Sequence, residues 1–192
     1  MADDISLKCT CGEVTGKAAG LSAENTNHII CHCADCRTFV EHLGGRTEPE
    51  GGVQITQMSP ARIRIIQGTE NIRCLRLSEK GLFRWYTDCC NTPIGATPPS
   101  AGIPSVGMLH NFIDLPPEAR TSVFGPVRGH VFLNEATGTA EQAAAIPKAG
   151  LALWVRMYGI VIGWKLRGDA RRNFFFKDGQ PIARPEILSV TP

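Results

Sequence analysis

Cys31-His32-Cys33-Ala34-Asp35-Cys36 is the stretch of this sequence that most strongly constrains the fold. Three thiols within six residues can converge on one ion if the chain turns tightly, with Zn–S distances of about 2.3 Å. Thiolate sulfur is a soft ligand that selects zinc over magnesium or calcium. His32 alternates with two cysteines, so its ring should face away from an ion that they share. The motif therefore predicts a zinc site with Cys31, Cys33 and Cys36 as ligands.

The number of ligands in this motif bears on its chemistry. Three protein ligands leave a tetrahedral zinc ion one short, and an open position is typical of a catalytic site. In the alternative interpretation, Cys89, Cys90 or His32 fills the fourth position and the ion is purely structural. Both interpretations remain open from the residues alone.

Cys9-Thr10-Cys11-Gly12 forms a second half-site. Residues two apart on an extended strand face the same side, so both sulfur atoms can point at one ion. The remaining cluster is Cys89-Cys90, whose adjacent side chains would face opposite ways on a regular strand. Either the chain turns sharply there, which the turn-forming sequence Asn91-Thr92-Pro93 favours, or each cysteine serves a different metal. We expect a closed, structural site, and one or two zinc ions per chain.

The cellular compartment helps to interpret the eight cysteines. The N-terminal sequence MADDISLKC lacks the basic and apolar regions of a signal peptide, which predicts a cytoplasmic protein. Thiols are kept reduced there, so metal binding explains the cysteines better than disulfides do. Cys74 stands alone and is expected to be a free, buried thiol. The formal net charge of +2 indicates no bulk attraction to nucleic acid or membranes.

The first half of the chain is punctuated by Gly, Asn and Pro and predicts a mainly β fold. Alternating or aromatic-rich segments predict strands at residues 53–57, 62–66, 73–77 and 82–87. Residues 44–52 are expected to form a loop, and residues 36–43 one or two helical turns.

The character of the sequence changes at a linker, residues 97–103. We expect a zinc-binding core over residues 1–97 and a C-terminal extension over 98–192, packed on the core as one compact domain. Within the extension the sequence predicts strand fragments at 122–124 and 130–132, a short helix at 140–145, and a buried or amphipathic helix at 151–166. The last segment is too short and too interrupted by charge for a membrane anchor.

CTCGEV at Cys9, CHCADC at Cys31 and CCNTPIG at Cys89 resemble the three cysteine blocks of the glutathione-dependent formaldehyde-activating enzyme family, which includes centromere protein V. Residues 64–95 also resemble the strands that lead into its last cysteine motif. The resemblance covers about residues 7–97 and implies an Mss4-like fold, in which antiparallel sheets fold over zinc in a β-tent. It implies a structural zinc on Cys9, Cys11 and Cys90 and a catalytic one on Cys31, Cys33 and Cys36.

This sequence departs from the family pattern at its last motif. The family usually ends in CxxC followed by Gly-Thr, but the first of those positions is Thr87 here and Asn91 replaces the glycine. Cys89 is then a candidate to supply the missing ligand from a shifted position. The tail after Thr97 has no clear counterpart in short family members.

An open zinc site can lower the pKa of an incoming thiol or polarise a carbonyl group. The resemblance implies a carbon–sulfur lyase, or the reverse reaction, on adducts of glutathione or another thiol. Arg37, Arg84 and His42 lie near the motifs and could hold a glutathione carboxylate, although solvation at the surface is the simpler account of each.

Two alternatives remain. The first is a non-catalytic zinc scaffold that binds protein or nucleic acid. Arg167, Arg171 and Arg172 precede three phenylalanines at 174–176, which is weakly typical of nucleic-acid binding, but we expect these rings to lie in the core. The second is thiol redox chemistry at Cys89-Cys90. The sequence does not indicate an oligomeric state.

Overall fold

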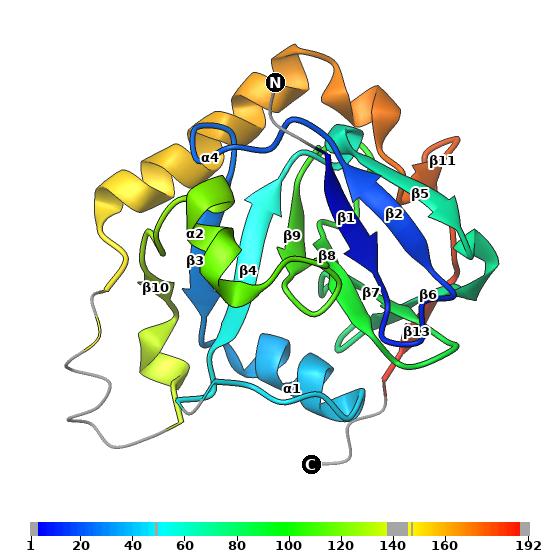
Figure 1. Cartoon of the computed structure of the whole chain (residues 1–192), viewed down its shortest axis with the longest axis horizontal. Coiled ribbons are helices and arrows are strands. Elements are labelled where there is room, and N and C mark those ends of the chain that lie inside the picture. Colours follow the sequence, from blue (N-terminus) through cyan, green and yellow to red (C-terminus); the bar gives the residue numbers. More distant parts are fainter. Residues whose placement is uncertain (1–3, 49, 138–145, 147, 189–192) are drawn as a thin grey trace.

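The computed structural model describes residues 4–48, 50–137, 146 and 148–188, and its architecture is mainly β (Figure 1). An eight-stranded sheet has the order β10-β3-β4-β9-β8-β7-β6-β13, and a three-stranded sheet has the order β1-β2-β5. The predicted fold class, mainly β with a C-terminal helix, is therefore confirmed. The strands of the two sheets are β1 (Ile5–Lys8), β2 (Thr15–Ala18), β3 (Asn27–Cys31), β4 (Val53–Met58), β5 (Ile63–Gln67), β6 (Ile72–Arg76), β7 (Phe83–Thr87), β8 (Pro93–Thr97), β9 (Val106–Leu109), β10 (His130–Val131) and β13 (Pro185–Ile187).

The four strands expected between residues 53 and 87 all form, and no bound differs from the prediction by more than one residue. They correspond to β4, β5, β6 and β7. Antiparallel pairing joins β3 to β4 from Asn27–Gln57 to Cys31–Val53, and joins β6 to β7 from Ile72–Thr87 to Leu75–Arg84. The expected helical turns form α1 (Ala34–His42), and the loop predicted before β4 is present in its described residues.

The hydrophobic core consists of two clusters of buried side chains. The first contains Leu7 of β1, Trp85 of β7, and Phe112 and Phe175, all less than 2% exposed. The three phenylalanines at 174–176 belong to this cluster or pack against it, as predicted. The second lies on the other face of the large sheet and joins β3, β4 and β9 to α1 and to the helix α4 (Leu151–Leu166).

The segment after Thr97 contributes strands to both edges and to the middle of the large sheet. Residues 98–105 connect β8 to β9, which pairs with β4 as well as β8. β10 and β13 add parallel strands at the two edges, beside β3 and β6. A two-stranded ribbon, β11 (Phe176–Lys177) with β12 (Gln180–Pro181), and the 3-10 turns η1 (Pro60–Arg62), η2 (Thr69–Asn71), η3 (Leu133–Glu135) and η4 (Asp169–Arg172) complete the described elements.

One predicted strand is wrong. Residues 122–124 belong to the helix α2 (Pro117–Phe124). Pro116 is the N-cap and Pro117 occupies the first turn, where a missing N–H costs nothing and the fixed φ suits a helix. Glu118 also complements the helix dipole there. The strand predicted at 130–132 does form, as β10, whereas the short helix predicted at 140–145 lies outside the described residues.

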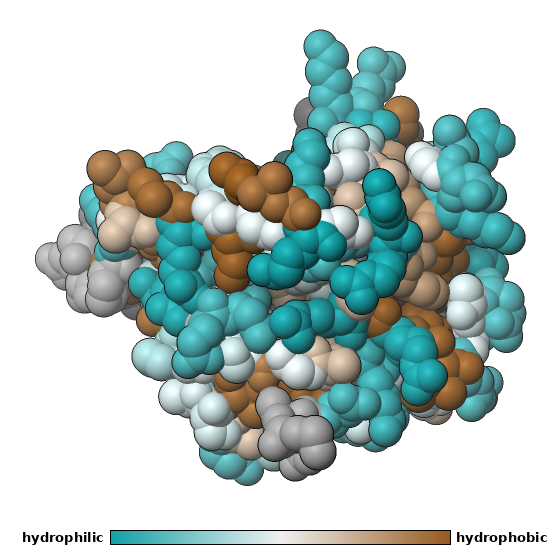
Figure 2. All heavy atoms as spheres, turned by 90° about the horizontal axis from the view of Figure 1, so that it is seen from above, coloured by the Kyte–Doolittle hydropathy of each residue, from teal (hydrophilic) through white to brown (hydrophobic). Residues whose placement is uncertain are grey.

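The long apolar segment forms the predicted helix, α4, which crosses one face of the molecule (Figure 1). Leu153 and Trp164 are buried, whereas a stripe of apolar side chains on the opposite face is exposed: Leu151, Val155, Tyr158, Ile162 and Leu166. Contrary to the sequence prediction, the helix is therefore neither buried as a whole nor amphipathic with a polar outer face. Figure 2, which views the molecule from above, shows hydrophobic groups interspersed among hydrophilic ones. Within the described part of the chain, no helix combines the length and apolar character needed to cross a membrane.

Candidate metal centres

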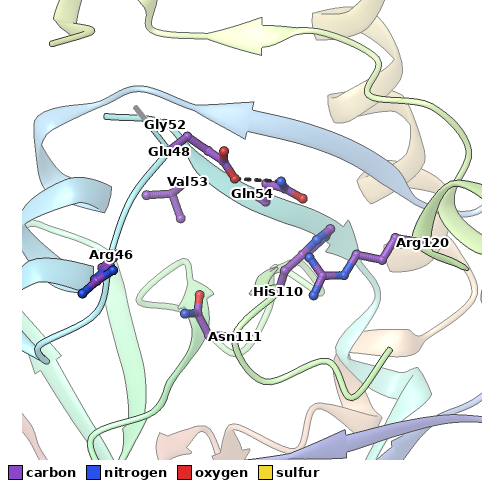
Figure 3. A pocket seen from close by; sticks show the side chains of 8 residues that line it. All are labelled: Arg46, Glu48, Gly52, Val53, Gln54, His110, Asn111 and Arg120. Atoms are coloured by element: carbon purple, nitrogen blue, oxygen red, sulfur yellow. Dashed lines mark hydrogen bonds between the residues drawn. The ribbon is translucent and has the colours of Figure 1, made fainter. Parts of the chain in front are cut away.

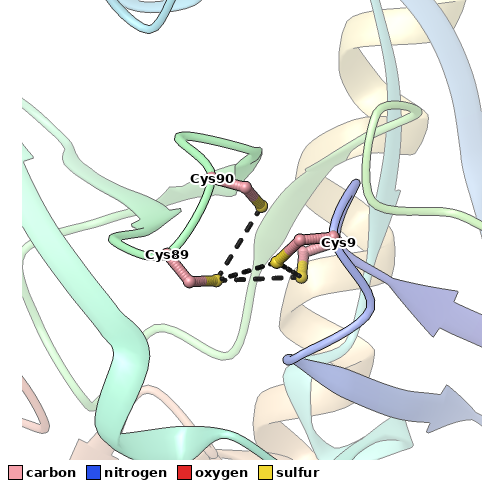
Figure 4. A group of neighbouring side chains, drawn as sticks. Cys9, Cys89 and Cys90 are labelled. Atoms are coloured by element: carbon pink, nitrogen blue, oxygen red, sulfur yellow. Dashed lines mark hydrogen bonds between the residues drawn. The ribbon is translucent and has the colours of Figure 1, made fainter.

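The loop after β1 and the turn between β7 and β8 bring four cysteines together (Figure 4). The Sγ atom of Cys89 lies 4.0 Å from that of Cys9, 3.4 Å from that of Cys11 and 3.8 Å from that of Cys90, and the Cys9 and Cys11 sulfur atoms are 3.5 Å apart. Four sulfur atoms around a tetrahedral zinc ion with bonds of about 2.3 Å are separated by about 3.8 Å. All four sulfur atoms lie within 4.8 Å of one another, so the donor set could hold such an ion with small adjustments.

Two backbone turns create this arrangement. Gly12 has φ of +85° and its N–H donates to the Cys9 carbonyl at 3.0 Å, which closes the loop between the first two cysteines. Asn91 has φ of +53°, a conformation that Asn tolerates better than most residues. The sharp bend expected after Cys90 is present, and both adjacent cysteines contribute to one cluster.

Threonine side chains that sequence reasoning missed surround the Cys90 sulfur. The Thr87 hydroxyl lies 3.3 Å from Cys90 Sγ and the Thr92 hydroxyl 3.1 Å from it. Burial raises the pKa of the Cys90 thiol, but these two hydrogen bonds oppose it and the pKa is lowered to about 5. Thr87 thus stabilises the thiolate form of Cys90.

The second cluster contains Cys31, Cys33 and Cys36. Cys31 ends β3, Cys33 is the N-cap of α1, and Cys36 lies in its first turn. The Cys31 and Cys33 sulfur atoms are 3.3 Å apart, and the Cys36 N–H donates to Cys33 Sγ at 3.4 Å. The positive end of the helix dipole therefore faces the Cys33 sulfur. The contact with Cys31 lowers the pKa of the Cys33 thiol, but its contact with Cys36 and burial raise this pKa overall. Contacts with Cys33 and Cys36, together with burial, raise the pKa of the Cys31 thiol.

The residues expected to lie outside the clusters do so. The His32 ring points elsewhere, with Nε2 2.9 Å from Nδ1 of His130 and Nδ1 3.3 Å from the Glu50 carbonyl. Cys74 is 2% exposed and belongs to neither group of cysteines.

Arg84 contradicts the expectation that it is solvated, because it is 2% exposed. Its Nη1 donates to Cys36 Sγ at 3.8 Å, its Nη2 lies 3.3 Å from Asp35 Oδ2, and its guanidinium stacks over Phe39. Hydrogen bonds from Cys31 and Cys33 hold the pKa of the Cys36 thiol well below its usual value, and Arg84 lowers this pKa further. Arg84 is thus a buried cation placed against the second cluster.

The three-cysteine cluster opens into a cavity of about 590 Å³ with mainly apolar walls. Cys31, Cys33 and Cys36 line it together with Arg84. Ile29, Ile55 and Leu109 of the sheet form one wall, and Trp154, Met157 and Tyr158 of α4 form another. This volume lies within the range of about 300–1,000 Å³ that is common for small-molecule sites. Sequence reasoning allowed the segment after Thr97 to fold over the site but did not identify α4 as the wall, although its largely apolar sequence was the available signal.

A separate polar pocket of about 210 Å³ is lined by Arg46, Glu48, Gly52, Val53, Gln54, His110, Asn111 and Arg120 (Figure 3). Burial, followed by the nearby charges of His28 and Arg120, lowers the pKa of His110 to about 3. No cysteine lines this pocket, so it is not part of either metal centre.

Comparisons with known proteins give little functional information. A search of curated proteins found no match. Among solved structures, the chain is similar to a crystal structure of a Rhodobacter sphaeroides protein, with 16% identity and a TM-score of 0.44, over 62% of this chain and 97% of that one. Residues 1–186 match a family described as a family of unknown function (DUF6151), and the chain belongs to that family.

Proposed function

We propose that this protein is a zinc-dependent enzyme that breaks or forms the carbon–sulfur bond of a thiol adduct at Cys31, Cys33 and Cys36. The observation that carries this proposal is the pairing of a three-thiol cluster with an adjacent ligand-sized cavity. A cluster of three ligands leaves room for a fourth from a substrate. The four-cysteine cluster, by contrast, can complete a tetrahedral ion alone, and we assign it a structural zinc.

A bound zinc ion would supply an open coordination position that takes a thiol sulfur and stabilises it as a thiolate. The chain's own residues determine the charge around that position. Three thiolates exceed the charge of one divalent ion, and Arg84 supplies a compensating cation at Cys36. A weakly Lewis-acidic site of this kind favours thiol exchange over water activation.

The proposed reaction is the cleavage of a thiohemiacetal, an adduct of a thiol and an aldehyde. The carbon–sulfur bond breaks, its electron pair remains on the sulfur as a thiolate, and a carbonyl group forms as the hydroxyl proton leaves. Asp35 and Glu135 are the carboxylates that line the cavity, and either can accept that proton. The apolar walls exclude water and orient the carbon being released.

The resemblance of the three cysteine blocks to the glutathione-dependent formaldehyde-activating enzymes supports both the reaction type and a β-tent around zinc. It makes glutathione one candidate for the thiol. Reduced thiol ligands also suit the cytoplasm, which we propose as the compartment.

Titration of cobalt-substituted protein with 2-mercaptoethanol and with glutathione tests this proposal. Coordination of either thiol should change the cobalt d–d and sulfur-to-metal charge-transfer bands, and the change should saturate. The Cys33→Ser variant, which keeps the four-cysteine site, should lose this response and retain most of its stability. No spectral change at millimolar concentrations of either thiol would contradict the proposed function.

A non-catalytic scaffold would then become the better account. The contacts of the basic segment do not favour nucleic-acid binding. Arg167 and Arg172 pair with Asp169 at 3.8 and 3.1 Å, and the Phe175 ring is 1% exposed, so no base can stack on it.

A further inference from the structure

The walls of the cavity beside Cys31, Cys33 and Cys36 also carry information on which thiol adduct it accepts. Few charged side chains line the cavity apart from the cysteines: Asp35, Glu135 and Arg84. Carboxylates thus outnumber cations, and three thiolates around a zinc ion would add further negative charge. An anionic ligand would meet repulsion here.

The cation in this wall is already engaged. Both terminal nitrogens of Arg84 contact protein groups, one at Cys36 Sγ and the other at Asp35 Oδ2. Glutathione carries two carboxylates, and binding sites commonly hold such groups with bidentate arginine contacts. Arg84 thus already compensates two anionic groups, Cys36 and Asp35, which weakens its attraction for a further carboxylate.

The other two side chains considered for a glutathione carboxylate, Arg37 and His42, do not line the cavity. The Nη1 atom of Arg37 donates to the carbonyl oxygens of His32 at 3.5 Å and Glu135 at 3.2 Å. His42 is exposed in the last turn of α1, whereas the cysteines lie at its first turn. The site therefore offers little that would recognise a charged tripeptide.

Three aromatic side chains, Phe132, Trp154 and Tyr158, line another part of the cavity. Trp154 of α4 lies between Phe132, with ring centroids 5.8 Å apart, and Tyr158, with centroids 6.4 Å apart. Phe132 is 45% exposed and Tyr158 is 67% exposed, so apolar surface remains available for a ligand to cover.

The backbone at Phe132 is consistent with a binding role. Phe132 has φ of +59°, in the left-handed region that bulky residues rarely adopt. Such a conformation costs about 1–3 kcal/mol and tends to occur at binding sites. The Phe132 ring lines the cavity and packs against Trp154.

We infer that the substrate of the three-cysteine site is an adduct of an uncharged, apolar thiol, whose hydrocarbon part lies against Phe132, Trp154 and Tyr158. This inference rests on the proposed function and narrows its substrate class. Glutathione adducts are then poor substrates, because their carboxylates lack partners while the aromatic surface stays uncovered.

Three thiols titrated separately into cobalt-substituted protein test the inference: phenylmethanethiol, which is apolar, 2-mercaptoethanol, which is small and uncharged, and glutathione. We expect phenylmethanethiol to saturate the cobalt spectral change at a concentration at least tenfold lower than glutathione. Trp154→Ala and Tyr158→Ala should each raise the phenylmethanethiol midpoint several-fold and change that of 2-mercaptoethanol by less than twofold. Leu151→Ala, an exposed α4 residue that does not line the cavity, is the matched control.

The outcomes separate the two proposals. Saturation by glutathione at a lower concentration than phenylmethanethiol would overturn the apolar substrate class and leave the open thiol-binding site intact. Equal effects of Trp154→Ala and Tyr158→Ala on phenylmethanethiol and 2-mercaptoethanol would also overturn it. A spectrum that responds to none of the three thiols would refute the proposed function itself.

Discussion

Cys9→Ser should leave the protein largely unfolded at 25 °C. Cys9 is fully buried in the first core cluster, and its sulfur lies within the four-cysteine centre that joins the end of β1 to the β7–β8 turn. Structural zinc contributes about 10–16 kcal/mol in small zinc domains, which exceeds the total stability of about 5–15 kcal/mol of a typical domain. Loss of near-ultraviolet circular dichroism and of the thermal transition would be the observed result.

Cys74→Ala is the matched control, since Cys74 is equally buried but lies outside both clusters. It removes one sulfur atom from the core and should cost only about 1–2 kcal/mol. If Cys9→Ser melts at the same temperature as Cys74→Ala, the four-cysteine centre does not hold the fold together.

Arg84→Met should weaken metal binding at the three-cysteine site by about 10–100-fold, which is the usual effect of losing a group that hydrogen-bonds a metal ligand. Arg84 is 2% exposed, and methionine can fill much of its space without restoring the cation beside Cys36. Competition with a chromophoric chelator would measure the affinity of each site. Arg84→Lys should recover part of the loss because it restores the charge.

The four-cysteine site provides an internal reference in the same protein, because Arg84 does not contact it. Arg73→Met, at an arginine whose side chain is 42% exposed and pairs with Asp88, controls for a general loss of positive charge. Unchanged affinity at the three-cysteine site in Arg84→Met would show that the guanidinium does not compensate the thiolates.

The sequence predicted the elements that carry local signals. Close spacing placed Cys31, Cys33 and Cys36 on one turn, and alternation identified the strands from Val53 to Thr87. The sequence left two alternatives for Cys89 and Cys90: a sharp turn that brings both to one cluster, or a different metal for each. The backbone at Asn91, where φ is +53°, decides between them, and no sequence pattern reveals that conformation. The proline pair at 116–117 was the missed signal for α2.

The features that sequence reasoning missed depend on contacts between distant segments. Arg84 lies between the buried Phe83 and Trp85 on β7, so its side chain points to the opposite face of the strand. If that face were exposed, as in a half-buried strand, Arg84 would lie in solvent. The face on which it lies is covered by α1, through Phe39, and no local pattern indicates that cover. The cavity likewise needs α4 to lie over β3 and β4, which are far earlier in the chain.

The central claim is that the protein contains two separate cysteine metal centres, one closed and one open. Elemental analysis of the purified protein, alongside a triple variant with Cys31, Cys33 and Cys36 replaced by serine, tests it most directly. The two clusters predict two zinc ions per chain in the natural sequence, and a folded triple variant that retains one. Folded protein without zinc, with disulfides inside either cluster, would contradict the account, as would a triple variant that still binds two ions.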